Sequence, residues 1–242
     1  FNAVKSLISI GYNGIIAIKS TVIPGTARKV EEMTRLPVVS NPEFLREGSA
    51  IYDTLHPDRI VIGSRDINAG DVVEKIWSFT KAPVIRTTNE NAELIKYAAN
   101  AFLVLKISFI NEIANLCEKI PGCDVKVIAK GIGLDKRIAP YFLKAGLGFG
   151  GPCLPKDTLA ITYFARNLGE PLTIIERAIN VNKERISRVL KTARDLIGDL
   201  RGKKIAVLGL AFKEGTDDVR ESQALKLIKS LKEEGAIVRA YD

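Results

Sequence analysis

Hydrophobic residues in the first third of the chain occur as short runs, separated by helical stretches and Pro/Gly turns. Short apolar runs between helical patterns are typical of strands in a parallel sheet that helices cover. Residues 1–87 are therefore predicted to form part of a doubly wound α/β domain, and Phe1 opens inside an amphipathic helical pattern. The predicted strands are Ile15 to Lys19, Val38 to Ser40, Ile60 to Ile62 and Val84 to Arg86.

The middle of the chain changes to helical spacing. We expect helices from Asn89 to about Lys119, from about Asp157 to Leu168 and from Pro171 to Ile197. The length of the first and third predicts a spine between two domains. Lys203 to Leu208 then predicts a buried strand, Glu221 to Glu234 a helix and Ala236 to Tyr241 another strand, where a second α/β domain begins.

The predicted architecture is α/β, with two doubly wound, Rossmann-like domains joined by a long central helix and a helical middle domain. We expect divisions at residues 1–88, 89–200 and 201–242. Both ends look cut, so the N- and C-terminal parts are expected to be incomplete.

Composition narrows the class of protein. The chain has 242 residues, 46% hydrophobic and 26% charged, which is typical of a folded globular protein. No apolar stretch approaches the roughly 20 residues that cross a bilayer, and no signal peptide is evident, so the sequence predicts a cytoplasmic protein with no membrane partner. The net charge of +8 could suit nucleic acid, but the Lys and Arg residues are spread along the chain and interleaved with 28 acidic residues. We therefore expect a phosphate-bearing small molecule and no nucleic-acid partner.

Cysteine and histidine usage excludes several kinds of site. Three cysteines without metal-ligand spacing favour free thiols over a disulfide framework or a zinc site. His56 is the only histidine, which argues against a Ser/His/Asp triad or a histidine-ligated metal, and we expect it to be structural.

The most unusual stretch is Gly146-Leu-Gly-Phe-Gly-Gly-Pro-Cys-Leu-Pro-Lys-Asp157. Four of its first six residues are glycine, which allows close approach of the backbone to a ligand, and Pro155 favours the first turn of the following helix. Cys153 is thereby predicted near a helix N-terminus, where the helix dipole and Lys156 favour thiolate over thiol. A buried structural cysteine in a tight turn is the alternative.

This segment resembles the catalytic motif of the UDP-glucose and GDP-mannose dehydrogenase family, and five further stretches resemble the family in the same order. The five stretches are Ser20 to Thr26, Asn41 to Gly48 with His56 to Arg59, Glu93 to Lys96 with Asn100, Gly209 to Lys213, and Thr216 to Ser222.

The G-x-G-x-x-G turn of a dinucleotide-binding site is absent from the sequence. The segment Gly209-Leu-Ala-Phe-Lys213 follows a predicted strand but departs from that pattern, so any such turn lies upstream of Phe1.

The resemblance implies NAD-dependent, four-electron oxidation of a sugar-nucleotide primary alcohol to a carboxylate. It implies that Cys153 adds to the aldehyde to give a thiohemiacetal, whose oxidation yields a thioester that water hydrolyses. Lys96 and Asn100, at i and i+4 on one helix, would stabilise the oxyanion. Glu47 would activate water, with Glu43, Thr21 and Asp157 in supporting roles; solvated side chains are the alternative reading of each.

The resemblance also implies binding residues and a partner. Arg137 follows a predicted turn at Gly131-Ile132-Gly133, and a homodimer follows if Arg137 reaches into the partner subunit's active site. Asp217 and Asp218 could serve as helix N-terminal caps. We expect the UDP-sugar to contact Phe44, Leu45, Arg137, Tyr141, Lys144, Phe149, Gly150, Phe212 and Lys213, and NAD to contact Thr21, Glu47, Lys156 and Arg220.

Within the resemblance, the sequence Gly-Pro-Cys-Leu-Pro-Lys-Asp of the cysteine motif favours UDP-glucose as the substrate. GDP-mannose and UDP-N-acetylhexosamine relatives share the mechanism. Two functions of other classes stay open. One is a non-catalytic nucleotide-sugar-binding or dimerisation fragment. The other is a two-electron 2-hydroxy-acid dehydrogenase, which needs no cysteine.

Overall fold

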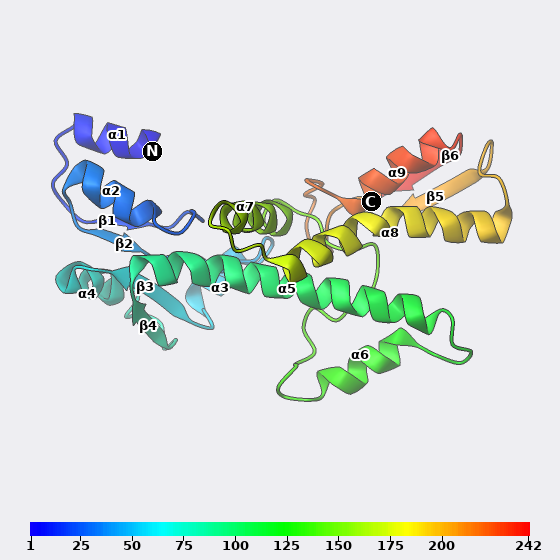
Figure 1. The fold of residues 1–242 in the computed structure, drawn as a ribbon, viewed down its shortest axis with the longest axis horizontal. Helices are drawn as coiled ribbons and strands as arrows, with labels where there is room; N and C mark the ends of the chain where they lie inside the picture. Colours follow the sequence, from blue (N-terminus) through cyan, green and yellow to red (C-terminus); the bar gives the residue numbers. More distant parts are fainter. The chain divides into compact units, whose positions relative to one another are not determined.

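A computed structural model describes residues 1–242, which fall into two compact units, Phe1–Ala99 and Asn100–Asp242. The strands and the N-terminal helix predicted for the first unit are confirmed to within two residues (Figure 1). Its elements are α1 (Asn2–Ser9), β1 (Ile16–Ile18), α2 (Thr26–Thr34), β2 (Val38–Ser40), α3 (Ala50–Leu55), β3 (Ile60–Ser64), α4 (Ile67–Ile76), β4 (Val84–Thr87) and the start of α5 (Asn89–Cys117).

The four strands form one sheet in the order β1-β2-β3-β4. β1 pairs with β2, and β3 with β4, in parallel, whereas β2 and β3 are antiparallel. The expectation of a parallel sheet is therefore wrong at this one pairing. Two parallel neighbours need a connection that carries the chain back along the sheet. The helix between β2 and β3 is α3, whose six residues span only about 9 Å, which is short for such a return.

Helices cover both faces of the sheet, as the doubly wound prediction requires. Neighbouring residues of β2 point to opposite faces: Val38 packs with Ala27 and Val30 of α2, and Val39 packs with Ala69 and Val73 of α4. All three residues of β2 are buried. The ends of β1 and β2 therefore rest on a packed core, which fixes the loops that follow them.

The second unit contains the three predicted helical regions and the two predicted strands, with bounds shifted by up to three residues. One helix was not predicted: α6 includes Gly131 and Gly133, which sequence reasoning assigned to a turn, and Asp124 caps it by accepting a hydrogen bond from the Lys126 N–H. The elements are the rest of α5, α6 (Val125–Gly133), α7 (Leu154–Asn167), α8 (Thr173–Ile197), β5 (Lys204–Leu208), α9 (Gln223–Glu233) and β6 (Ile237–Tyr241).

Strands β5 and β6 form a two-stranded parallel sheet. The prediction of a buried strand is wrong for β5, where Val207 is buried but Leu208 is 78% exposed. The reason is that the described core of this sheet lies on one side only, against α8 and α9. The predicted cap at Asp217 or Asp218 is also wrong, because α9 begins after Ser222, whose hydroxyl accepts from the Leu225 N–H.

A disulfide joins Cys117 at the end of α5 to Cys123. The expectation of three free thiols is wrong for this pair, since the turn between them returns the chain and brings the two Cα atoms to 5.2 Å. Cys153 lies outside the disulfide and is exposed. No described helix is long and apolar enough to span a membrane, and no cluster of side chains is suited to a metal ion.

Candidate active site

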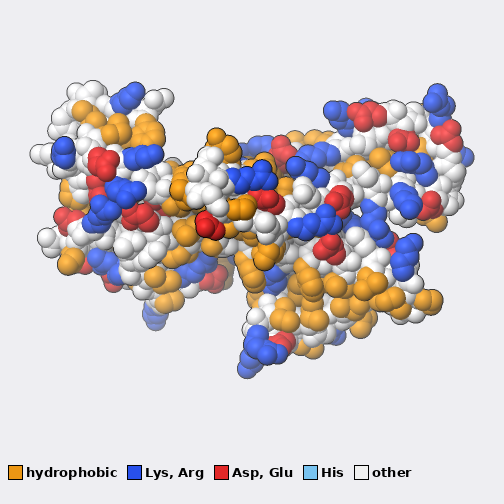
Figure 2. All heavy atoms as spheres, in the orientation of Figure 1, with side chains coloured by type: hydrophobic (Ala, Val, Ile, Leu, Met, Phe, Trp, Pro, Cys, Tyr) orange, Lys and Arg blue, Asp and Glu red, His pale blue; other side chains and the backbone are white.

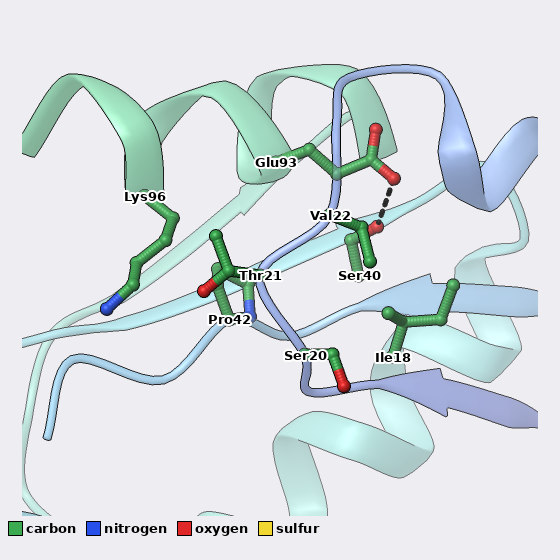
Figure 3. A pocket seen from close by; sticks show the side chains of 8 residues that line it. All are labelled: Ile18, Ser20, Thr21, Val22, Ser40, Pro42, Glu93 and Lys96. Carbon is green, nitrogen blue, oxygen red and sulfur yellow. Dashed lines mark hydrogen bonds between the residues drawn. The ribbon is translucent and has the colours of Figure 1, made fainter. Parts of the chain in front are cut away.

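In the first unit, a small pocket opens where β1 and β2 end and α5 passes (Figure 3). Thr21 belongs to the loop after β1, and Pro42 to the loop after β2. Lys96 and Glu93 reach it from α5. The structure thus brings two predicted catalytic residues, Thr21 and Lys96, to the carboxyl ends of parallel strands, where α/β sheets bind ligands.

Lys96 is buried, with 5% of its surface exposed, so the solvated alternative does not describe it. Its ammonium lies 3.2 Å from one carboxylate oxygen of Glu43, and the other oxygen of Glu43 accepts a 2.6 Å hydrogen bond from the Leu45 N–H. The same ammonium lies 5.3 Å from the centre of the Phe44 ring. The Arg59 guanidinium lies 3.7 Å from the centre of that ring. A buried cation is therefore held between a carboxylate and an aromatic face.

The loop that carries Glu43 is anchored at both ends. At its start, the Asn41 amide oxygen accepts hydrogen bonds from Lys19, at 3.1 Å, and from the Trp77 indole, at 2.9 Å. Part of Lys19 is exposed, but its ammonium loses hydration in this contact, which lowers its pKa. Glu43 opposes the shift and Lys96 adds to it.

At the other end of this loop, Arg46 and Asp53 form an ion pair of 2.6 Å. Its hydrogen bonds lower the pKa of Asp53 from 3.8 to about 2. Glu47, between the two anchors, is half-buried. The loop is thus held in place around the predicted carboxylates.

In the second unit, Cys153 is the N-cap residue of α7, and Pro155 lies in the first turn, as the sequence predicts. Asp157, one turn further, is 1% exposed. One of its oxygens accepts a 2.6 Å hydrogen bond from the Asn100 amide, and the other pairs at 2.6 Å with the Lys156 ammonium. The structure thereby joins Asn100, Asp157 and Lys156 beside the exposed cysteine.

The glycines before Cys153 pack against the chain's own segments. A Cβ atom on Gly150 would meet the Glu221 carbonyl oxygen at 2.4 Å, and one on Gly151 would meet the Phe212 ring at 2.6 Å. Asn182 of α8 binds both the N–H and the carbonyl of Phe149. The close approach that the glycines allow is therefore used, in the described chain, to seat the cysteine loop on the Phe212 segment and α8.

The remaining predicted binding residues lie mostly on the surface. Tyr141 is 73% exposed, Arg137 pairs at 2.6 Å with Asp135, and Lys144 lies 3.9 Å from Glu214. Arg220 donates from Nε to Asp218 at 2.7 Å. The structure does not gather these side chains into one cluster. Leu45 is exposed, Phe149 is buried, and the Lys213 ammonium lies 5.9 Å from the Phe212 ring.

Sequence reasoning gave no role to several residues that support the site. Asn41 directly follows a strand, and Glu93 precedes Lys96 by three residues on the same face of α5. Both positions were signals, since a polar residue there faces the strand ends. Lys19 directly follows β1 and carried the same signal, although the predicted strand included it. Trp77 and Asn182 carried no comparable signal.

Comparison with known proteins matches three models of one family to the chain, in order. The NAD binding domain of the UDP-glucose/GDP-mannose dehydrogenase family matches residues 2–81, its central domain residues 90–184 and its UDP binding domain residues 206–242.

Individual relatives agree with this match. The chain is 49% identical to UDP-glucose 6-dehydrogenase TuaD of Bacillus subtilis, over 96% of this chain and 52% of the relative. It is 49% identical to UDP-glucose 6-dehydrogenase of Rickettsia bellii, over 98% of this chain and 57% of the relative. A solved UDP-glucose dehydrogenase from the archaeon Pyrobaculum islandicum is 44% identical, with a TM-score of 0.89 over 93% of this chain and 54% of that one.

The chain spans about half the length of the curated relatives it matches. The resemblance and the α/β, Rossmann-like fold predicted from the sequence are confirmed. With three models matched in order over most of its residues, the chain belongs to the UDP-glucose/GDP-mannose dehydrogenase family.

Proposed function

We propose that the protein oxidises UDP-glucose to UDP-glucuronate with NAD, in two hydride transfers through a covalent intermediate on Cys153. The observation that carries this proposal is the group around the cysteine: an exposed thiol at the N-terminus of α7 next to a buried Asp157 that binds Asn100 and Lys156. A simple dehydrogenase needs no such thiol. The names of the relatives given above support UDP-glucose as the substrate.

In the first oxidation, the C6 alcohol of the sugar loses a proton and a hydride and becomes an aldehyde. When bound, NAD supplies the hydride acceptor for this step and for the second oxidation. Lys96 is suited to stabilise the developing oxyanion, because its buried ammonium acts where water does not screen it. Asn100 would add a hydrogen bond, and Thr21 would help to order water.

The second oxidation needs a carbon that again carries a removable hydride. The Cys153 thiolate adds to the aldehyde carbon, and the resulting oxyanion takes a proton, which gives a thiohemiacetal. Loss of a hydride and of the hydroxyl proton gives a thioester. Water then attacks the carbonyl, the C–S bond breaks, and the carboxylate and the Cys153 thiol are released.

The carboxylates would divide the proton transfers. We assign activation of the hydrolytic water to Glu47, with Glu43 in support through its ion pair with Lys96. Asp157 would orient the lysine beside the thiol, which is consistent with its 2.6 Å contact to Lys156. Lys156 and the N-terminus of α7 both favour the thiolate.

The described residues fit NAD in part. Thr21 lies in the pocket at the end of β1, where a nicotinamide cofactor binds an α/β sheet. We propose Thr21, Glu47, Lys156 and Arg220 as its contacts in this chain. The glycine-rich turn for the pyrophosphate is not among these 242 residues.

The UDP-sugar would be held by both polar and apolar groups. Arg137, Lys144 and Lys213 supply charge for a pyrophosphate, and guanidinium forks suit its oxygens. A stacking or apolar surface would come from Phe44, Leu45, Tyr141, Phe149, Gly150 and Phe212.

A homodimer is supported by apolar side chains on one face of α5. Phe102, Phe109 and Leu116 recur every seven residues and are 61%, 51% and 58% exposed. Figure 2 shows hydrophobic side chains gathered over the second half of α5 and over α6. Large exposed apolar patches of this kind mark interaction surfaces. We propose that two copies pair through this region. We also propose that the chain is divided into domains at residues 1–88, 89–200 and 201–242.

We also propose a cytoplasmic location, because a catalytic thiol such as Cys153 is maintained in a reducing compartment. The Cys117–Cys123 disulfide argues in the opposite direction, because disulfides persist in oxidising compartments.

UDP-N-acetylhexosamines are the second candidate substrates. A similar solved structure, UDP-D-ManNAc dehydrogenase of Pyrococcus horikoshii, supports them, with 29% identity and a TM-score of 0.85.

The number of NADH molecules formed per sugar nucleotide tests the proposal. The full-length gene product is expected to form two NADH per UDP-glucose, and Cys153→Ser is expected to lower the rate of complete oxidation by on the order of 1,000-fold or more. The double variant Cys117→Ser/Cys123→Ser makes the same chemical change elsewhere and should still form two. Unchanged oxidation by Cys153→Ser would contradict the assignment of Cys153 as the nucleophile. A single NADH per UDP-glucose from the wild-type protein would indicate a two-electron dehydrogenase. Binding of UDP-glucose by the wild-type protein without formation of NADH would indicate a non-catalytic protein.

A further inference from the structure

Glu93 is a buried carboxylate to which the proposed mechanism assigns no role. It lies on α5, three residues before Lys96, and is 3% exposed. Burying a carboxylate is costly unless hydrogen bonds compensate. Burial raises the pKa of Glu93, and the Ala27 and Gly25 N–H groups only partly oppose the shift. Its hydrogen bonds therefore show what this charge holds in place.

Both oxygens of Glu93 bind the start of α2. One accepts from the Gly25 N–H at 2.6 Å, and the other from the Ala27 N–H at 2.8 Å. The first N–H groups of a helix have no partner inside it. The N-cap residue of α2 is Gly25, whose φ of 91° lies in the left-handed region and which has no side chain to serve as a cap. Glu93 thus supplies the cap from another element.

The same carboxylate also reaches the end of β2. The Ser40 hydroxyl donates to it at 3.4 Å, as the dashed line in Figure 3 shows. The short loop between β1 and Gly25 carries Thr21, so the strand fixes one end of that loop and Glu93 the other. Glu93, Thr21 and Lys96 line one pocket, and Lys96 lies on the same face of α5 as Glu93.

We propose that Glu93 is a positioning residue of the active site, because its two-pronged cap on α2 holds the Thr21 loop against the face of α5 that carries Lys96. Its effect on catalysis rests on the proposed function, whereas its effect on the loop does not. The test is therefore divided into a measurement of loop protection and a measurement of activity.

Amide hydrogen exchange in the full-length gene product measures the cap. Glu93→Gln keeps the size of the side chain, but its NH₂ group cannot accept a hydrogen bond, so one of the two N–H groups loses its partner. Exchange in residues 20–27 should become on the order of tenfold faster, the equivalent of one net hydrogen bond. The control is Glu112→Gln, further along α5, whose half-exposed carboxylate pairs with Arg177, away from α2. Unchanged exchange in residues 20–27 of Glu93→Gln would overturn the proposal.

Activity measures the consequence. Misplacement of Thr21 relative to Lys96 should lower kcat by roughly 10- to 100-fold, with little change in KM for the sugar nucleotide. The acid limb of the pH profile adds a readout that altered stability alone does not move. The groups that face Glu93 are Glu90, the Ser40 hydroxyl and the Gly25 and Ala27 N–H groups. Lys96 lines the same pocket, and its ammonium pairs with Glu43. Protonation of Glu93 at low pH removes an acceptor and should contribute to the fall in wild-type activity. Glu93→Gln has no carboxylate to protonate at this position, so its activity should fall less as the pH is lowered.

Faster exchange with wild-type kcat and an unchanged acid limb would refute the catalytic part of the proposal. If the wild-type protein forms no NADH, the proposed function fails, and the exchange rates alone then decide whether Glu93 holds the Thr21 loop. Ser40→Ala removes only the 3.4 Å hydrogen bond and should accelerate exchange in the same residues to a smaller extent.

Discussion

At the scale of single residues, the ion pair between Arg46 and Asp53 should make stability depend on pH. The folded-state pKa of Asp53, about 2, lies below its ordinary 3.8. The ionised carboxylate therefore stabilises the folded state above about pH 4, and this contribution is lost as the pH falls toward 2. Asp53→Asn should lower the melting temperature by a few degrees at pH 7, and the difference should shrink between pH 4 and pH 2.

Thermal melts of both proteins across that pH range check this prediction. Asp195→Asn removes an exposed helical aspartate and is the control, which should melt like the wild type at every pH. A constant difference between Asp53→Asn and wild type from pH 7 to pH 2 would show that ionisation of Asp53 is not the cause.

The site residues show what the sequence can supply at this scale. Spacing along one helix placed Lys96 and Asn100 on a shared face, but a lysine in a helix is most often solvated, and only the family motif singled it out. The 2.6 Å bond between Asn100 and Asp157 joins residues 57 positions apart. Such a contact depends on how α5 and α7 pack in the second unit, which no local pattern encodes.

At the scale of elements, the glycines before Cys153 should differ sharply in their tolerance of a methyl group. Gly150→Ala would place Cβ 2.4 Å from the Glu221 carbonyl oxygen, and Gly151→Ala would add a clash with Phe212 at a φ of +82°. Each change should cost about 1–3 kcal/mol of folding free energy, since backbone or ring must move. Gly146→Ala is the matched control, because its Cβ would have no neighbour within 4 Å.

Denaturant unfolding gives the free energies, and the rate of Cys153 alkylation by iodoacetamide reports the loop. Gly151→Ala should change both relative to Gly146→Ala. Equal stability and equal alkylation rates in the two variants would mean that the cysteine loop is not seated on Phe212.

Elements with strong periodicity were predictable, and those with mixed signals were not. The four strands of the first unit were predicted because they are short apolar runs between turns and helical stretches, and the long α5 and α8 because their pattern has helical spacing. Helix α6 was missed because Gly131 and Gly133 read as turn residues, yet its Asp124 cap and apolar Val125 to Ile132 face sustain a helix. The antiparallel β2–β3 pair depends on the path of residues 41–59, where loop and short helix leave no periodic signal.

At the scale of the whole molecule, the sequence indicated two α/β parts and a helical middle because the type of periodicity changes at Asn89 and again near Lys203. It could not reveal the Cys117–Cys123 disulfide, since three cysteines allow several pairings and only the turn between them brings this pair together. Nor does spacing alone show whether apolar residues on a helix face the core or a partner. Phe102 and Phe109 fit the α5 pattern equally well either way, and the structure exposes them.

That exposure leads to a prediction for the assembly. If two copies pair through α5, the double variant Phe102→Glu/Phe109→Glu places four carboxylates in the apolar interface and removes the burial of four rings. Each buried ring contributes about 1.5–3 kcal/mol and each unpaired charge opposes burial, so the dimer dissociation constant should rise by at least 100-fold or so. Phe79→Glu, at a comparably exposed phenylalanine of the first unit, should leave assembly unchanged. Size-exclusion chromatography with light scattering distinguishes the two results, and a double variant that stays dimeric would place the interface elsewhere.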